Sequence, residues 1–204
     1  MEQTFYRSYA KPLLDGALTV PVLILLSPVY ALIALVIRLN MGAPILFRQT
    51  RSGYQGVPFT IFKFRTMTID CDEFGNLLPD ARRLTRLGRF LRSSSLDELP
   101  ELWNVLRGEM SLVGPRPLLV QYMTRYSPAQ ARRLMVKPGL TGWTQVHGRN
   151  ALGWEQKFEL DVWYVDHVSF GLDIKILLLT LPTVLKRAGI VSQGHSTVEE
   201  FFGN

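Results

Sequence analysis

The sequence predicts a mainly α-helical protein with one small β-hairpin, an α+β class, joined to a membrane by an N-terminal helix. Three observations support this prediction. Residues 16–37 carry no charge and are mostly Leu, Ile, Val and Ala, and a membrane span needs roughly 20 such residues. Residues 43–67 contain two runs rich in β-branched and aromatic side chains, separated by glycines. Most later segments repeat apolar residues at helical spacing.

We expect two parts, a membrane helix within residues 1–40 and a domain of residues 41–204 with amphipathic helices at the membrane interface. The chain of 204 residues has 23 Lys and Arg against 17 Asp and Glu, so its formal net charge is +6. This excess implies an anionic partner, whether nucleic acid, a phosphorylated substrate or a membrane surface. The single cysteine, Cys71, excludes an internal disulfide, and its acidic neighbours lack the spacing of a zinc site.

The membrane helix has features that oppose a simple crossing. Ser27 and Pro28 lie in the middle of the apolar run and Pro21 precedes them, so a kink is expected there. The Ser27 hydroxyl is a local donor for a carbonyl freed by the break. Basic residues flank both ends of the run, namely Arg7, Lys11, Arg38, Arg48 and Arg51. The positive-inside rule places both flanks on the cytoplasmic face, which a re-entrant helix would satisfy, while the length of the run equally permits a spanning helix, so both arrangements stay open.

Asp15 is an unusual residue at the edge of the apolar run. Two roles are open to it. It can pair with Lys11 one helical turn earlier, or it can anchor the helix at the level of the lipid headgroups.

The runs ILFRQ and VPFTIFKF, separated by Gly53 and Gly56, predict the β-hairpin. Lys63 and Arg65 alternate with phenylalanines, so a strand places both cations on one face. That face either meets a phosphate or is solvated, and these residues by themselves favour the solvated face. A polar loop is expected over residues 70–79.

Arg82, Arg86 and Arg89 recur at helical spacing with leucines on the opposite side, which predicts one basic amphipathic helix ending at Arg92. Such a helix can lie near an anionic membrane, form one wall of an anion site, or present a solvated arginine face. In each case its end concentrates positive potential beside the segment that follows.

That segment, SSSLDELPELWNVLRGEMSLVGPRP, contains the adjacent carboxylates Asp97 and Glu98. Pro100 cannot lie deep in a helix, so a helix through the following leucines begins within a turn of it. A helix N-terminus keeps a carboxylate ionised and also favours a second anion such as phosphate. Plain capping is the alternative, with Glu98 three residues after Ser95 as a capping box. Arg116, in a Gly-Pro-Arg-Pro turn, can direct a guanidinium toward the same anion.

The following third of the chain predicts helices joined by a glycine-rich connector. Two helices are expected between residues 118 and 135, broken at Ser127–Pro128. The connector KPGLTGWTQVHGRN offers Gln145 and Arg149 as binding groups. The segment WEQKFELDVWYVDH repeats aromatic residues at helical intervals, and Asp161 within it requires a partner such as an arginine or a metal.

The end of the chain is predicted to contain one more helix. Residues 173–187 are strongly apolar with basic ends, which suits either a core helix or a helix in the membrane interface. The tail, residues 194–204, is expected to be loosely held.

Taken together, these motifs closely resemble the bacterial sugar transferase family, the monotopic polyprenyl-phosphate phosphoglycosyl transferases, in their minimal PglC-like form. The matching elements, in family order, are KPLLD, SP in the membrane helix, FKFRTM, RSSSLDELPELWNVLRGEMSLVGPRP, KPGLTGWTQVHGRN and KFELDVWYV. They cover nearly the whole chain. One departure is Pro12, where the family commonly has a second basic residue, and this weakens an inferred headgroup contact.

The resemblance implies an enzyme that moves a sugar 1-phosphate from a UDP-sugar to undecaprenyl phosphate and releases UMP, with Mg²⁺. The sugar is expected to be an N-acetylated hexosamine or of the bacillosamine type. It also implies a re-entrant helix broken at Ser27–Pro28 and a catalytic domain on the cytoplasmic face of the bacterial inner membrane.

The resemblance makes Asp97 the nucleophile of a covalent aspartyl-phosphosugar intermediate, and Asp97 and Glu98 the residues that help to hold the metal. Whether Glu98 is a base or a metal ligand stays open. The substrate-binding residues carried by the motifs are Lys63, Arg92, Arg116, Arg149 and Asp161.

Other classes explain less of the sequence. A non-catalytic, basic, membrane-anchored scaffold is the main alternative, and it would tolerate loss of Asp97. An aspartyl-phosphate phosphatase or ATPase would ordinarily show Asp-x-Asp after a strand, whereas this Asp-Glu pair precedes a helical pattern. A nucleic-acid-binding module explains the charge but not the membrane segment, so no nucleic-acid partner is expected. No residue pattern selects the sugar, the pathway or the oligomeric state.

Overall fold

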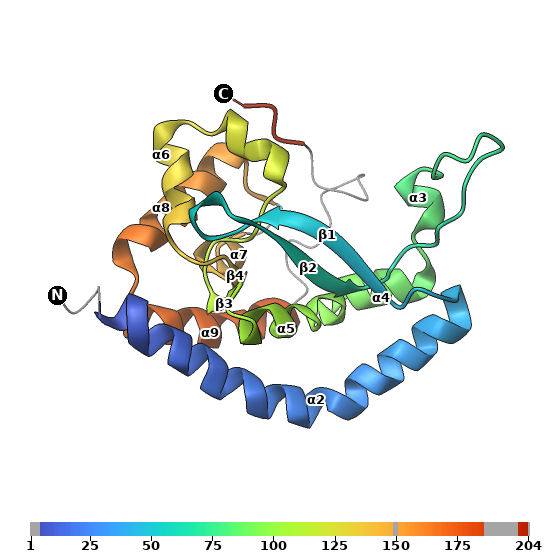
Figure 1. Cartoon of the computed structure of the whole chain (residues 1–204), viewed down its shortest axis with the longest axis horizontal. Helices are drawn as coiled ribbons and strands as arrows, with labels where there is room; N and C mark the ends of the chain where they lie inside the picture. Colours follow the sequence, from blue (N-terminus) through green and yellow to red (C-terminus); the bar gives the residue numbers. More distant parts are fainter. Residues whose placement is uncertain (1–4, 149–150, 186–199, 204) are drawn as a thin grey trace.

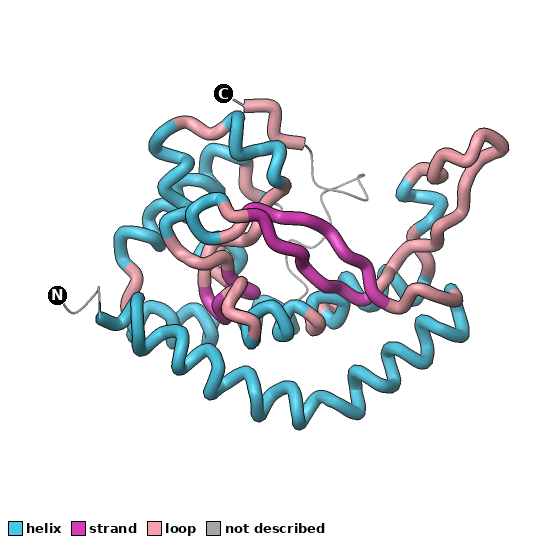
Figure 2. The backbone as a smooth tube through the Cα atoms, in the orientation of Figure 1, coloured by secondary structure: helices cyan, strands magenta, loops and turns pink. Residues whose placement is uncertain are grey.

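The computed structural model describes residues 5–148, 151–185 and 200–203, and within them helices predominate around one antiparallel hairpin, as predicted (Figures 1 and 2). Helical turns that are not α-helical are labelled η. In chain order the elements are η1 (Tyr6–Ala10), α2 (Lys11–Met41), β1 (Leu46–Ser52), η2 (Tyr54–Gly56), β2 (Pro58–Phe64), α3 (Asp80–Arg83), α4 (Arg86–Ser93), η3 (Leu96–Glu98), α5 (Glu101–Leu106), β3 (Ser111–Val113), η4 (Val120–Arg125), α6 (Pro128–Ala131), η5 (Arg132–Met135), β4 (Gly139–Thr141), α7 (Trp143–Val146), α8 (Trp154–His167) and α9 (Phe170–Leu185).

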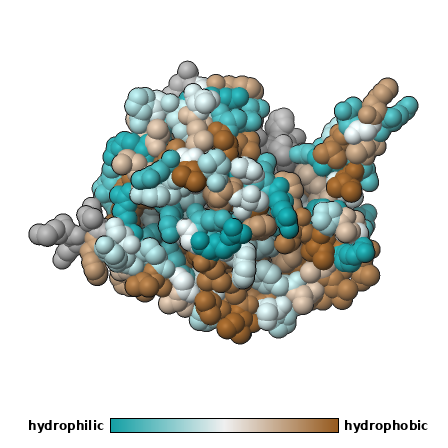
Figure 3. All heavy atoms as spheres, in the orientation of Figure 1, coloured by the Kyte–Doolittle hydropathy of each residue, from teal (hydrophilic) through white to brown (hydrophobic). Residues whose placement is uncertain are grey.

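The N-terminal helix is the apolar element that the sequence predicts. With η1 it forms 36 continuous residues, and its most apolar stretch has a mean hydropathy of 2.6, with 11% of it buried, so by length and composition it can anchor the chain in a membrane. Figure 1 shows it running below the rest of the chain, with its middle lowest in the view, and apolar side chains gather along the same lower face in Figure 3. The Ser27 hydroxyl donates to the Ile24 carbonyl at 2.8 Å. Pro28 has no amide to offer that carbonyl, so the Ser27 hydroxyl serves it, while α2 continues as one helix from Lys11 to Met41.

The first turns of α2 are attached to the domain by two buried charges. Lys11 forms an ion pair with Asp173 of α9, and the Asp15 carboxylate accepts the Leu112 amide of β3 at 3.2 Å. Asp15 is 8% exposed, so both roles predicted for it, a pair with Lys11 and a headgroup anchor, are wrong. Both side chains point toward the domain, where the partners are more than 90 residues away in sequence.

The last turns of α2 pack on the same body. Ile33 and Ile37 form a buried cluster with Phe64 at the end of β2 and Leu91 of α4. Arg65 is buried and donates to the last carbonyls of the helix and its flank, including Gly42 at 2.9 Å. A solvated face for Arg65 is therefore wrong, because helix C-terminal carbonyls that lack amide donors take the guanidinium instead.

The hairpin pairs β1 with β2 in antiparallel register from Leu46 opposite Phe64 to Ser52 opposite Pro58. The outer edge of β2 is covered by one side chain. Asn104 of α5 donates to the Thr60 carbonyl at 2.7 Å and accepts the Phe62 amide at 3.3 Å. It thereby takes the place of a third strand, and this fixes α5 against the hairpin.

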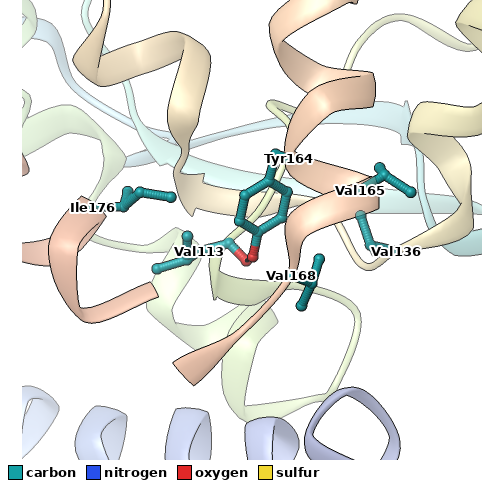
Figure 4. Close-up of a cluster of buried hydrophobic side chains, with 6 residues drawn as sticks. All are labelled: Val113, Val136, Tyr164, Val165, Val168 and Ile176. Carbon is teal, nitrogen blue, oxygen red and sulfur yellow. Dashed lines mark hydrogen bonds between the residues drawn. The ribbon is translucent and has the colours of Figure 1, made fainter. Parts of the chain in front are cut away.

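A second sheet of two short parallel strands, β3 and β4, is not predicted by the sequence pattern. It forms where two glycine-containing loops cross. A Cβ on Gly114 would lie 2.4 Å from the Lys137 carbonyl, and one on Gly142 would lie 2.1 Å from the Gly114 carbonyl. Only glycine allows this approach. Tyr164 fills the core beside it, surrounded by valines and Ile176 (Figure 4).

The predicted basic helix is two helices, α3 and α4, so the prediction of one continuous helix is wrong. Leu84 is extended and bridges to Met67, and the Thr85 hydroxyl accepts the Gly88 amide at 2.9 Å to cap α4. The local cap overrides the arginine periodicity.

The break at Ser127–Pro128 is confirmed, with a complete capping box at the start of α6.

The C-terminal helices α8 and α9 follow the predicted segments. Helix α9 buries Asp173 and Ile176 but exposes Phe170 and Leu178, so it has both a core face and an apolar outer face. The described part of the tail packs against the domain, so the prediction of a loosely held tail is wrong for it. Phe201 is 3% exposed and fills an aromatic pocket beside α8, where it contacts the Tyr122 and Phe158 rings.

Candidate active site

The carboxylates Asp97 and Glu98 lie in η3, and Pro100 is the N-cap of α5, so the helix begins where the sequence predicts. The capping-box alternative is wrong. Ser95 is left-handed, with φ of 57°, and its side chain makes no capping hydrogen bond. The Glu98 carboxylate instead binds cations from other elements.

Glu98 joins the hairpin to the Gly-Pro-Arg-Pro turn. Its Oε1 accepts Lys63 Nζ at 2.6 Å and also Arg116, and Lys63 reaches Glu101 at 3.1 Å. The solvated face favoured for Lys63 is therefore wrong. Burial alone would lower the pKa of Lys63, but Glu101 and Glu98 raise it. Burial would likewise raise the pKa of Glu98, but Arg116 and Lys63 hold it well below its ordinary value, so Glu98 stays ionised.

Asp97 has the opposite electrostatics. It is 8% exposed, and its carboxylate accepts no hydrogen bond from any residue that the structure describes. Burial and then the neighbouring Glu98 charge raise its pKa to about 6, against the attraction of Lys63, Arg116 and Arg92. Its oxygens are thus near three cations while remaining available to another group.

Three of the predicted binding residues meet here. Lys63, Arg92 and Arg116 all act on Asp97, and Arg92 is oriented by a hydrogen bond from its Nε to the Thr66 hydroxyl at 3.0 Å. Arg149 lies outside the described residues.

Asp161 does not join this cluster. Its carboxylate binds Arg133 at 2.8 Å and 3.0 Å and the Thr144 hydroxyl at 2.6 Å, so the arginine partner expected for it is confirmed. Arg133 also donates to the Arg116 carbonyl at 2.6 Å. Asp161 therefore supports the turn that carries Arg116 from behind.

Two charged residues near Asp97 were not predicted as site residues from the sequence. Glu101, 2% exposed, shares Lys63 with Glu98 and stands three residues after it, a helical spacing that could have indicated it. Arg51 appeared only as a basic flank. Burial and the neighbouring Arg116 charge lower its pKa to about 10. The hairpin register could have found it, because Gln49, Arg51 and Lys63 all lie on one face.

Comparison with known proteins identifies the family. A model of the bacterial sugar transferase family matches residues 6–187. The chain belongs to the bacterial sugar transferase family. It is 59% identical over 169 residues to the uncharacterized sugar transferase EpsL of Bacillus subtilis, covering 83% of this chain and 84% of that protein.

Two further relatives carry more informative names. A UDP-glucose:undecaprenyl-phosphate glucose-1-phosphate transferase of Caulobacter vibrioides is 44% identical over 188 residues, covering 86% of this chain and 69% of that protein. An enzyme of the same name from Escherichia coli K12 is 40% identical over 179 residues, covering 82% of this chain but only 38% of its own length. This bacterial sugar transferase chain thus spans less than half of the E. coli protein.

The acidic residues of the site offer only a few of the ligands that a metal ion needs. No cluster of three or more His, Cys, Asp and Glu able to hold a metal exists within residues 5–148, 151–185 and 200–203. Mg²⁺ needs fewer, since it commonly takes one or two carboxylates and completes its shell with water and substrate phosphates. Asp97 fits that use because nothing described occupies its oxygens, whereas Glu98 already binds two cations.

Elsewhere in the chain two other features are distinct from the Asp97 cluster. Gln145, a predicted binding residue, is buried beside Gly142, and neither polar atom of its side chain has a hydrogen-bond partner in the described part of the chain. A half-open cavity of about 550 Å³ lies along the hairpin between Arg48, Phe62 and Arg107, and it contains none of the predicted site residues.

Proposed function

We propose that this chain transfers a sugar 1-phosphate from a UDP-sugar to undecaprenyl phosphate and releases UMP, through a covalent intermediate on Asp97. The observation that carries the proposal is a buried carboxylate that accepts no described hydrogen bond and lies among Lys63, Arg92 and Arg116. The names of the relatives support the same substrate classes. For the sugar we propose an N-acetylated hexosamine or bacillosamine type, from the family resemblance.

In the first step a carboxylate oxygen of Asp97 attacks the phosphorus that bears the sugar. The bond between that phosphorus and the bridging oxygen of the diphosphate breaks, and its electron pair leaves with UMP. An aspartyl phosphosugar remains. Asp97 is suited to this role because a nucleophile needs an oxygen that no donor holds, and because a raised pKa makes the ionised oxygen more basic.

In the second step a phosphate oxygen of undecaprenyl phosphate attacks the same phosphorus. The acyl phosphate bond breaks, Asp97 regains its carboxylate, and the product is a sugar diphosphate lipid. Lys63 and Arg116 hold Glu98 ionised and in place, and together with Arg92 they offset the charge of the phosphates. Mg²⁺ held by Asp97, with Glu98 beside it, would neutralise phosphate charge when bound.

For the membrane attachment we propose a re-entrant α2 broken near Pro28, with the domain on the cytoplasmic side of the bacterial inner membrane. Support comes from the contacts at its two ends. Lys11 binds Asp173, and Ile37 packs with Phe64 and Leu91, so both ends lie against one body. A helix that crossed the bilayer would place its ends about 30 Å apart on opposite faces.

The nucleophile is tested by incubating the enzyme with UDP-sugar and Mg²⁺ in the absence of lipid. We expect one equivalent of UMP per enzyme and an adduct of one phosphosugar in the intact-protein mass. Asp97→Asn should abolish both. Asp166→Asn, an exposed carboxylate paired with Arg132, is the matched control and should keep both. A stoichiometric burst that survives Asp97→Asn would exclude the assignment, and no burst from the native chain would favour a non-catalytic scaffold.

The topology is tested by cysteine labelling in a Cys71→Ser background. A cysteine introduced at Gln3 should resist an impermeant reagent added from the periplasmic side and react once the membrane is permeabilised. Labelling of the intact cell from outside would contradict the re-entrant arrangement.

A further inference from the structure

We infer that Arg51, together with Arg116, holds the phosphate that leaves as part of UMP, the phosphate of the UDP-sugar that is attached to uridine. This inference rests on the proposed function and deepens it, because it assigns one of the two phosphates of the donor to a place in the site.

The strand register brings Arg51 beside the Arg116 turn. The end of β1 runs along the segment after that turn, where the Ser52 amide donates to the Leu118 carbonyl at 2.9 Å and Arg51 bridges to Leu119. Residues two apart on a strand share a face, so Arg51 lies on the same face of β1 as Gln49, and β2 adds Lys63 to that face. Arg51 and Lys63 thus approach the Arg116–Glu98 pair from one face of one hairpin.

The guanidinium of Arg51 has fewer partners than its burial requires. One terminal nitrogen donates to Gln49 Oε1 at 2.5 Å, while the Nε is buried and has no hydrogen-bond partner among the residues that the structure describes. Within the described parts of the chain Arg51 forms no ion pair. Arginine carries five N–H donors, and a buried charge is costly unless an anion pairs with it. A guanidinium with a buried, unused donor is typical of a site that binds an anionic ligand.

Two of the three carboxylates nearby already bind cations. Glu98 binds Lys63 and Arg116, and Glu101 binds Lys63, while the remaining acid of the cluster is Asp97. The charge that acts most on Arg51 is the like charge of Arg116. A phosphate between these two guanidinium groups would convert a repulsion into two charge-assisted contacts.

The position relative to the nucleophile selects the phosphate. Arg116 binds Glu98, the neighbour of Asp97 in the chain, and Leu119, three residues after Arg116, bridges to Arg51. The Arg116 turn therefore adjoins both Asp97 and Arg51. Displacement at phosphorus places the attacking and leaving oxygens in line, so the phosphate next to the reacting one extends away from Asp97. The phosphate attached to uridine is therefore assigned to Arg116 and Arg51, the guanidinium groups that adjoin each other beside Asp97. The phosphate of the acceptor lipid is the competing occupant.

The test uses the full-length enzyme and compares Arg51→Gln and Arg51→Lys with Arg48→Gln. Arg48 is the matched control because it lies three residues away on the same strand, is exposed, and is outside the site. UMP serves as the probe, as a product inhibitor of the complete reaction. The KM for UDP-sugar and the KM for undecaprenyl phosphate are measured alongside, and melting temperatures verify folding.

For Arg51→Gln we expect the UMP inhibition constant and the KM for UDP-sugar to rise about tenfold or more, as for loss of a charge-assisted hydrogen bond, with the lipid KM unchanged. Arg51→Lys should recover part of the loss, and Arg48→Gln should match the native enzyme. Unchanged UMP inhibition overturns the inference, and so does a rise confined to the lipid KM. Should Arg51→Gln not fold, Arg51→Lys decides by the same two constants. A native enzyme that neither releases UMP nor is inhibited by it would instead refute the proposed function.

Discussion

Two buried carboxylates of this chain differ in how completely their oxygens are used. Asp173, 4% exposed, accepts the hydroxyls of Tyr6 and Tyr164 at 2.7 Å each and pairs with Lys11. Asp97, 8% exposed, has cations around it but accepts no described hydrogen bond. A buried acid without partners is unfavourable for folding, so a fold keeps one only where something other than stability is served. The first carboxylate joins elements, and the second is available to a substrate.

Asp161, like Asp173, joins elements of the fold, and removing its carboxylate should have the largest effect on stability. Asp161→Asn leaves Arg133 buried without its anion, so we expect a loss of about 3–5 kcal/mol in the free energy of unfolding. Chemical denaturation in detergent measures it. Replacing Arg133 with Met in the same chain should recover part of the loss. A cost below about 1 kcal/mol would remove the distinction between the two types of carboxylate.

The opposite result is expected at Asp97. Its pKa in the folded chain, about 6, lies above the ordinary value of 3.8, so folding favours the protonated acid and stability is lost as pH rises from about 4 through 6. Asp97→Asn escapes this loss. It should be more stable than the native chain by about 1–3 kcal/mol at pH 7.5, and the advantage should disappear near pH 4.

Melting temperatures at the two pH values measure this effect, with Asp166→Asn as an exposed control. A native chain that is more stable than Asp97→Asn at pH 7.5 would mean that Asp97 is held by its surroundings in the way Asp173 is.

The rate of the UMP burst should follow the same ionisation. In the proposed mechanism only the charged Asp97 attacks, so the rate should rise about tenfold per pH unit below 6 and level off above 7. Glu98 stays ionised throughout and adds no second step. The burst without lipid is the right measurement, because a phosphate monoester such as the lipid titrates near pH 6 itself. A rate that is flat or falls between pH 5 and 7 would contradict this prediction.

The smallest effect concerns α2. Ser27→Ala removes the donor to the Ile24 carbonyl, which has no amide partner because of Pro28, so we expect a loss of about 0.5–1.5 kcal/mol. The control is Thr183→Ala, whose hydroxyl donates to the Leu179 carbonyl at 2.7 Å while the helical amide of residue 183 serves the same carbonyl. Equal losses from the two variants would mean that the missing amide of Pro28 does not make the Ser27 hydrogen bond more important than that of Thr183.

Local signals in the sequence predicted much of this fold. Glycines between β-branched runs gave the hairpin, Ser127–Pro128 gave a helix break, and Pro100 gave the start of α5. Each depends on residues within a few positions of one another, where backbone chemistry decides the outcome. The prediction of a single basic helix was wrong because it followed the spacing of the arginines and overlooked another local signal, the Thr85 cap.

Contacts between distant segments were not accessible in that way. The parallel pairing of β3 with β4 and the attachment of Lys11 to Asp173 join residues that no repeat relates. One continuous motif predicted four residues of the site, namely Arg92, Asp97, Glu98 and Arg116. Arg51 was not among them, because its relevance appears only when the hairpin is laid against the segment after Arg116.

One hydrogen bond connects the apolar helix α2 to the turn that carries Asp97. Tyr30, in the middle of α2, donates to the Leu99 carbonyl, two residues beyond Asp97. In the proposed membrane arrangement, this bond would hold the turn that carries the carboxylate close to the helix that enters the lipid. In the proposed reaction a long isoprenoid acceptor can keep its tail in hydrocarbon while only its headgroup rises to react, so no hydrophobic chain has to be drawn into water.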